Sequence, residues 1–234
     1  MKTPSLKSFS AAGPWEPVLL FWLFFLPGYL SPFLGGLEDA LFNSPSLLWL
    51  YLITIFPQIW LVFYLIDREQ AIPRRVFGLG RLTKRDLALI LPSLAGVFLF
   101  LILPEILLTL FPLSEVDVFW ETLSWSYVNP AAWPLVLLVC LAIGYHEEIY
   151  FRAYLFTRLE LSGWPRSGII FLISLLFASG HLYQGLPGFV VTFALGVFFG
   201  GLFLRYRSLH LAAITHGLYN FTVLLLSYFQ GLSV

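Results

Sequence analysis

The segment that decides the fold is Tyr145–Arg152, YHEEIYFR, which closes an almost uninterrupted apolar run over residues 131–144. Ionisable side chains within a membrane helix are costly, face the protein interior and mark functional sites by default. In an α-helix Glu148 and Arg152 share one face and can pair, whereas Glu147 points about 100° away from Glu148. The spacing predicts one carboxylate neutralised by the arginine and a second left available for chemistry. A purely structural ion pair accounts equally well for Glu148 and Arg152, but it leaves Glu147 unexplained.

The composition around this segment is typical of a membrane protein. Of the 234 residues, 59% are hydrophobic and 11% are charged, against roughly 45–50% and 25% in soluble domains. The length suits one polytopic membrane domain, residues 1–234, with about seven helices of ~20 residues each. The formal net charge is zero, so nothing indicates a nucleic-acid partner. Cys140 has no second cysteine to pair with and is predicted to be a small buried packing residue.

Apolar runs predict an all-α membrane bundle with N-terminal helices in residues 17–112 and a motif-bearing core at about 131–230. The expected helices cover residues 18–34, 47–66, 87–111, 131–159, 167–183, 187–204 and 209–228. Pro27 is expected to kink the first helix. Gly196 and Gly200 lie four residues apart on the sixth helix and allow a close contact with a neighbouring helix.

Loop charges predict how the helices are oriented. With a cytoplasmic N-terminus and alternating helices, one side receives the basic segments 67–86, 158–166 and 205–207. The loops on the other side, which contain no lysine or arginine, are residues 35–45, 112–130 and 182–188. The pattern obeys the positive-inside rule. We therefore expect a multi-pass protein of the plasma (inner) membrane, with segment 67–86 as a topology signal and lipid-headgroup anchor.

Two further polar clusters lie within apolar helices. His181 lies near the end of the expected fifth helix, and His216 and Asn220 share a face of the seventh because they are four residues apart. A single histidine in a membrane helix is equally well explained as a packing residue. Three helices that each contribute an acid, a histidine or an amide at compatible depths favour a site. His146 is expected to point to another face, and His210 to lie at the membrane border.

The chemistry that fits these groups is hydrolysis. A buried glutamate can act as a general base on water, a histidine can orient that water, and a histidine–amide pair can donate to the oxyanion of a tetrahedral intermediate. Residues 146–150, HEEIY, depart from the His-Glu-x-x-His zinc pattern because position 150 is tyrosine. A zinc site made of Glu147, His181 and His216 remains sterically conceivable.

The three motifs are similar to those of the CPBP family, which comprises CAAX prenyl proteases and bacteriocin-processing or immunity proteins, also called glutamic intramembrane endopeptidases. They are Glu-Glu-x-x-x-Arg at 147–152, Phe-x-x-x-His at 177–181 and His-x-x-x-Asn at 216–220. The resemblance covers about residues 140–225 and holds at every motif position. Residues 1–130 carry no signature of this family.

The resemblance implies a role for each motif residue on the acidic side of the site. Glu147 would activate the water, Glu148 and Arg152 would shape and support the site, and His181 would help to hold the water. No cofactor or metal would be required, with zinc as the alternative.

The resemblance also implies an oxyanion hole made of His216 and Asn220. The implied fold is a helical membrane bundle with an intramembrane catalytic cavity, reached from the lipid and cytoplasmic sides. The implied partners are the lipid bilayer and a membrane-associated or lipid-modified protein or peptide, cut near its terminus.

Three alternatives stay open. The first is a zinc-dependent membrane protease that uses the same residues. The second is a non-catalytic immunity or scaffold protein that binds a peptide without cutting it. The third is a small transporter with Glu147 as a proton relay, for which the sequence shows no inverted repeat.

Overall fold

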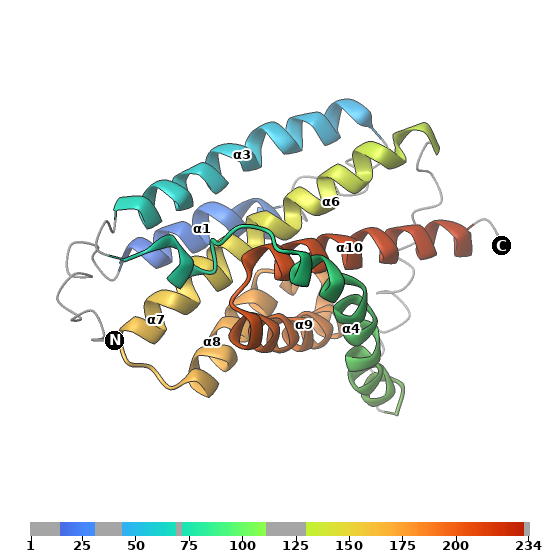
Figure 1. Ribbon diagram of the computed structural model, residues 1–234. Coiled ribbons are helices and arrows are strands. Elements are labelled where there is room, and N and C mark those ends of the chain that lie inside the picture. The colour runs from blue at the N-terminus through green and yellow to red at the C-terminus, as the bar shows by residue number, and fades with distance from the viewer. Residues whose placement is uncertain (1–14, 31–43, 69–71, 111–129, 232–234) are drawn as a thin grey trace.

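The computed structural model describes residues 15–30, 44–68, 72–110 and 130–231, and within these ranges every regular element is helical (Figure 1). The α-helices are α1 (Trp15–Leu30), α3 (Pro45–Arg68), α4 (Lys84–Leu110), α6 (Trp133–Glu148), α7 (Thr157–Leu161), α8 (Arg166–Ser179), α9 (Gly185–Tyr206) and α10 (Leu209–Gly231). The short helices are η3 (Arg74–Phe77), η4 (Pro130–Ala132) and η6 (Leu182–Gln184), and a π-helical segment, η5 (Ile149–Phe156), joins α6 to α7. Because α6, η5 and α7 are continuous, the described chain forms seven main rods.

Five of these rods are long and apolar enough to cross a membrane: α3, α4, the continuous α6–α7 rod, α9 and α10. The chain is therefore an integral membrane protein, and the predicted all-α membrane bundle is confirmed. The rods α1 and α8 are apolar but shorter. With 14 residues, α8 is about 21 Å long, which is less than the ~30 Å hydrocarbon core. The chain that follows α8 can therefore lie within the membrane.

The end of the fifth helix was predicted wrongly. It was expected to run to residue 183, but α8 ends at Ser179, and His181 lies in the turn before η6. The His181 amide bonds to the carbonyl of Ala178, three residues back, and its Nδ1 lies 2.8 Å from the Phe177 carbonyl oxygen. The imidazole thus binds the Phe177 carbonyl oxygen, which the His181 amide would bind if the α-helix continued.

The other predicted helices agree with the structure to within three residues wherever their ends are described. The helix α1 continues through Pro27. The expected loop at 112–130 lies outside the described residues, apart from Pro130.

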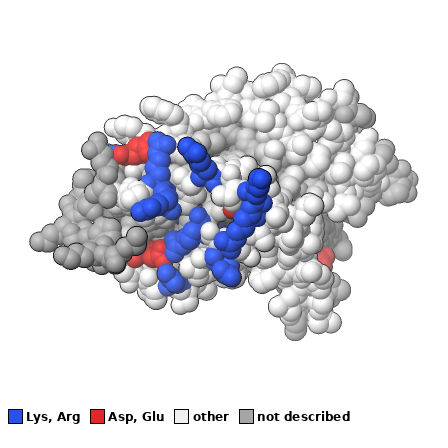
Figure 2. Space-filling model, viewed as in Figure 1, with Lys and Arg blue, Asp and Glu red and all other residues white. Residues whose placement is uncertain are grey.

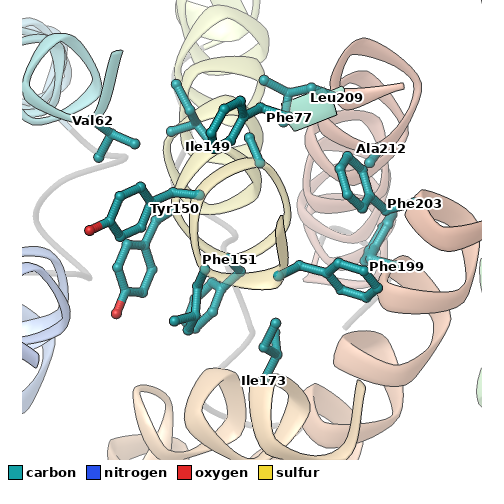
Figure 3. Packing of buried hydrophobic residues seen from close by; sticks show 14 of the residues in the cluster. Val62, Phe77, Ile149, Tyr150, Phe151, Ile173, Phe199, Phe203, Leu209 and Ala212 are labelled. Carbon is teal, nitrogen blue, oxygen red and sulfur yellow. The ribbon is translucent and has the colours of Figure 1, made fainter. Parts of the chain in front are cut away.

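The core of the bundle is built around η5, whose eight residues are all buried. Figure 3 shows Ile149, Tyr150 and Phe151 pointing from η5 toward different neighbours. The residues that meet them come from α3, η3, α8, α9 and α10, and include Val62, Phe77, Ile173, Phe199, Phe203, Leu209 and Ala212. A π-helical turn is rare and is often found at functional sites. Here it follows directly after the two glutamates and carries Arg152.

Two glycines bring α6 and α10 into backbone contact, and Figure 1 shows α6 lying between α3 and α10. A Cβ atom on Gly144 would contact the Ala213 carbonyl oxygen and lie 2.7 Å from the Gly217 nitrogen. A Cβ atom on Gly217 would lie 2.7 Å from the Leu141 Cα. The predicted close contact of Gly196 is also present, since its Cβ would lie 2.7 Å from the Ser174 Cα on α8.

The substitution Gly144→Ala is expected to push α6 away from α10 and to destabilise the fold by about 1–3 kcal/mol, as overpacking does. The matched control is Gly201→Ala on α9, where a Cβ atom would meet nothing within 4 Å. Thermal unfolding of the two variants in detergent measures the difference. Equal melting temperatures would show that the α6–α10 contact tolerates a methyl group.

Ion pairs link the ends of several helices at one end of the bundle. Figure 2 shows lysines and arginines gathered in a band there. Glu16 near the start of α1 accepts hydrogen bonds from Arg68 at the end of α3, at 2.6 Å, and from Arg158 in α7, at 2.7 Å. Glu160 in α7 pairs with Arg166 at the start of α8 and with Arg207 just after α9. The alternating helix directions predicted from the loop charges are therefore present. That this end faces the cytoplasm stays a prediction.

Candidate active site

Glu148 and Arg152 form a fully buried ion pair at the centre of the bundle, as their spacing predicts. Arg152 Nη1 donates to Glu148 Oε1 at 2.9 Å, and both side chains have no exposed surface. Arg152 Nη2 donates to the Gly196 carbonyl oxygen on α9 at 3.2 Å. The guanidinium carbon also lies 5.2 to 5.8 Å from the ring centroids of Phe151, Phe177 and Phe199. Such contacts with aromatic faces stabilise a desolvated cation.

His216 on α10 lies between the two glutamates. Its Nδ1 is 2.9 Å from Glu148 Oε1, and its Nε2 is 3.5 Å from Glu147 Oε2. The ring stacks on Phe199 with centroids 4.7 Å apart. Because an ionised carboxylate only accepts hydrogen bonds, the Nδ1 of His216 is the donor to Glu148, which leaves Nε2 facing Glu147. This hydrogen bond to Glu148 was not predicted from the sequence.

His181 approaches Glu147 from the other side. Its Nε2 lies 3.9 Å from Glu147 Oε1, while its Nδ1 is engaged by the Phe177 carbonyl oxygen. The Glu147 side chain keeps 12% of its surface exposed, whereas the Glu148 side chain keeps none. The structure thus brings three sequence-predicted residues together and places an imidazole nitrogen near each oxygen of Glu147.

Asn220 and the two remaining histidines lie outside this cluster of contacts. Asn220 is partly buried one turn beyond His216 on α10, and its side chain forms no hydrogen bond within the described part of the chain. His146 points to another face than Glu147, as predicted, and there it meets α3 and α1: its Nε2 is 2.8 Å from Gln58 Oε1 and its ring stacks on Phe24 at 4.2 Å. His210 bonds to the Tyr145 hydroxyl at 2.8 Å, near the basic end of the bundle.

Helix α1 contributes a wall of the site that the sequence motifs did not indicate. A Cβ atom on Gly180 would lie 2.7 Å from the Phe25 ring, and the Phe25 and His181 ring centroids are 6.5 Å apart. The Tyr150 hydroxyl donates to the Pro17 carbonyl oxygen at 2.8 Å. In the sequence, Gln58 interrupts the apolar residues of α3. This polar residue could have indicated that α3 lies beside the helix that carries the two glutamates.

No three His, Cys, Asp or Glu side chains among the described residues are grouped as ligands of a metal ion. The three side chains considered as zinc ligands converge: the Nε2 atoms of His216 and His181 lie 3.5 and 3.9 Å from the oxygens of Glu147. Cys140 is buried in a second apolar cluster with residues of α3, α6 and α10, as predicted for a packing residue.

Residues 129–222 match the family described as type II CAAX prenyl endopeptidase Rce1-like. This segment is Rce1-like. It contains all three motifs, so the family resemblance predicted from them is confirmed. The Rce1-like match indicates a CAAX-type intramembrane protease and hence a protein substrate in a membrane context. Comparisons with curated proteins and with solved structures found no match.

Proposed function

We propose that this protein is a glutamic intramembrane endopeptidase in which Glu147 is the general base. The observation that carries the proposal is that two adjacent carboxylates have different surroundings. Glu148 is held by Arg152 and by Nδ1 of His216, both at 2.9 Å. Glu147 forms no direct hydrogen bond within the described ranges and faces imidazole nitrogens at 3.5 and 3.9 Å. These separations suit a water molecule shared between the carboxylate and the imidazoles.

The reaction we propose uses Glu147 as a base and then as an acid. Glu147 takes one proton from the water, and the resulting hydroxide adds to the carbonyl carbon of the scissile peptide bond. The carbonyl oxygen becomes negative in the tetrahedral intermediate. Glu147 then returns the proton to the amide nitrogen as the C–N bond breaks, which releases an amine and a carboxylic acid and leaves the enzyme unchanged.

His216 and Asn220 are the proposed donors to the negative oxygen. The Nδ1 proton of His216 is directed to Glu148, so a second proton on Nε2 would point toward the reacting atoms, with Glu148 stabilising the imidazolium. The side chain of Asn220, one turn further along α10, supplies an amide donor to the same oxygen. His181, with Nδ1 fixed by a backbone carbonyl, presents Nε2 toward the proposed water.

The proposed substrate is a membrane-associated or lipid-modified protein that is cut near its terminus. The Rce1-like match supports this class, and so does the position of the site on helices that cross the membrane. We further propose that the basic end of the bundle faces the cytoplasm of a plasma (inner) membrane, as the positive-inside rule expects.

The experiment that tests this function compares protein termini in host membranes that carry either the wild type or Glu147→Gln at equal abundance. New termini that depend on Glu147 would establish proteolysis and identify the substrate. If all termini are the same, peptide binding without cleavage becomes the better account. In that case crosslinking to the wild type would recover a bound but intact partner.

Metal dependence is tested separately, because zinc could be held by Glu147, His181 and His216. We propose a metal-free reaction and expect full activity after dialysis against a strong chelator. The measurement is the cleavage rate of the purified protein before and after chelation, with zinc then added back. Loss of activity that only zinc restores would favour the zinc protease.

A further inference from the structure

A cavity of about 480 Å³ lies at the basic end of the bundle, apart from the glutamate site. It is partly open and is lined by the segment that leads into the first turn of α4 and by the residues around the end of α9. Its charged and aromatic lining consists of Arg81, Arg85, Asp86, Tyr206 and Arg207. None of the residues around Glu147 lines it, so it belongs to a different site.

Two of its cations are not neutralised. Arg207 donates to Glu160 on α7. In contrast, Arg81 and Arg85 have no carboxylate partner within the described ranges, and the Arg85 guanidinium lies over the Tyr206 ring at 5.2 Å from its centroid. An arginine held against an aromatic face keeps its planar donor edge free for an anion.

Asp86, the acidic residue that lines the cavity, is hydrogen-bonded to Thr83. The Oδ2 atom of Asp86 accepts hydrogen bonds from the Thr83 amide at 2.8 Å and from the Thr83 hydroxyl at 2.6 Å. These bonds cap the start of α4 and hold the Asp86 carboxylate there without removing its charge. Arg81 and Arg85 still outnumber this one carboxylate, so the charges that line the cavity leave a positive surplus, with donors suited to a phosphate group.

The cavity lies where the apolar spans of two helices end. The apolar span of α4 begins at Lys84, and that of α9 ends at Tyr206. Leu82, which follows Arg81, and Leu87, two residues after Arg85, are 44% and 54% exposed. Exposed leucines beside free arginines suit a ligand that has both acyl chains and a phosphate. We propose that this cavity binds the headgroup of an anionic phospholipid.

The test uses the full-length protein in a neutral detergent, titrated with short-chain phosphatidylglycerol in a calorimeter. The cavity variant is Arg81→Gln/Arg85→Gln. The matched control is Arg75→Gln/Lys84→Gln, which removes the same charge from two exposed residues that do not line the cavity. We expect one saturable site in the wild type and the control, and affinity at least about tenfold weaker in the cavity variant. Short-chain phosphatidylcholine should show no such site.

Equal weakening in the two double variants would overturn the proposal, because it would show attraction to general surface charge. Absence of a saturable site for phosphatidylglycerol and for inorganic phosphate in the wild type would also overturn it. If inorganic phosphate binds as tightly as the lipid, the ligand is a free anion and the lipid assignment is wrong. Thermal unfolding confirms that the variants are folded, and Arg81→Gln alone gives a second, milder variant with the same expected direction.

Discussion

The substitution Glu147→Gln is expected to lower the rate of peptide cleavage at least about a hundredfold, and up to about ten-thousandfold. Glutamine has nearly the same shape as glutamate but cannot take a proton from water, and general-base catalysis contributes 10²–10⁴-fold in typical enzymes. The fold should be unchanged, because Glu147 makes no direct hydrogen bond within the described part of the chain and is not fully buried. The measurement is single-turnover cleavage by purified protein of a membrane-anchored peptide.

The control for this prediction is Glu105→Gln on α4, which removes a carboxylate of the same kind from an apolar helix outside the cluster. Glu147→Gln should unfold at the wild-type temperature, and of the two variants only Glu147→Gln should lose cleavage. Wild-type rates in Glu147→Gln would assign the base to another group. Loss of activity in both variants would show that the assay reports on the integrity of the bundle and not on the base.

The residues of the candidate site could be predicted from the sequence because charged and polar residues stand out within apolar helices. A charged or polar residue within an apolar helix needs a partner, so Glu147, Glu148, His181 and His216 were conspicuous. The pairing of Glu148 with Arg152 followed from local helical geometry and needed no knowledge of the tertiary structure.

The contacts between helices could not be predicted in the same way. The hydrogen bond between His216 and Glu148 depends on how α10 is rotated and shifted against α6, and that register is set by the backbone contact at Gly144 and Gly217. The π-helical hydrogen bonds of η5 differ from α-helical ones by a one-residue shift, which leaves no mark in the composition.

The misplaced end of α8 has a local cause. Leu182 and Tyr183 continue the apolar residues of the helix beyond Ser179, so helix periodicity alone extends the helix. The His181 side chain instead bonds to the Phe177 carbonyl, and Gly180 allows the Phe25 ring of α1 to approach. The imidazole lies outside the helix, and its Nε2 is 3.9 Å from Glu147 Oε1. The error therefore lies at a residue we assign to the site.

The substitution Arg152→Ala is expected to destabilise the fold by about 3–5 kcal/mol, much more than Glu147→Gln. Removing one partner of a buried ion pair leaves the other as an uncompensated charge. Glu148 is fully buried, and its Oε2 atom already has no hydrogen-bond partner within the described residues. The Gly196 carbonyl and the aromatic rings around the guanidinium also lose their contacts. The measurement is unfolding of the purified protein, by heat or by a denaturing detergent.

A second variant separates charge from volume. In Glu148→Leu/Arg152→Met both charges are replaced by apolar side chains of similar size, and replacing a buried ion pair in this way is often neutral or stabilising. We expect this double variant to recover most of the stability that Arg152→Ala loses. It should remain inactive, because the Nδ1 of His216 no longer has the Glu148 carboxylate to hold its orientation and charge. If Glu147→Gln and Arg152→Ala lose equal stability, the proposed division between a supporting and a catalytic carboxylate is wrong.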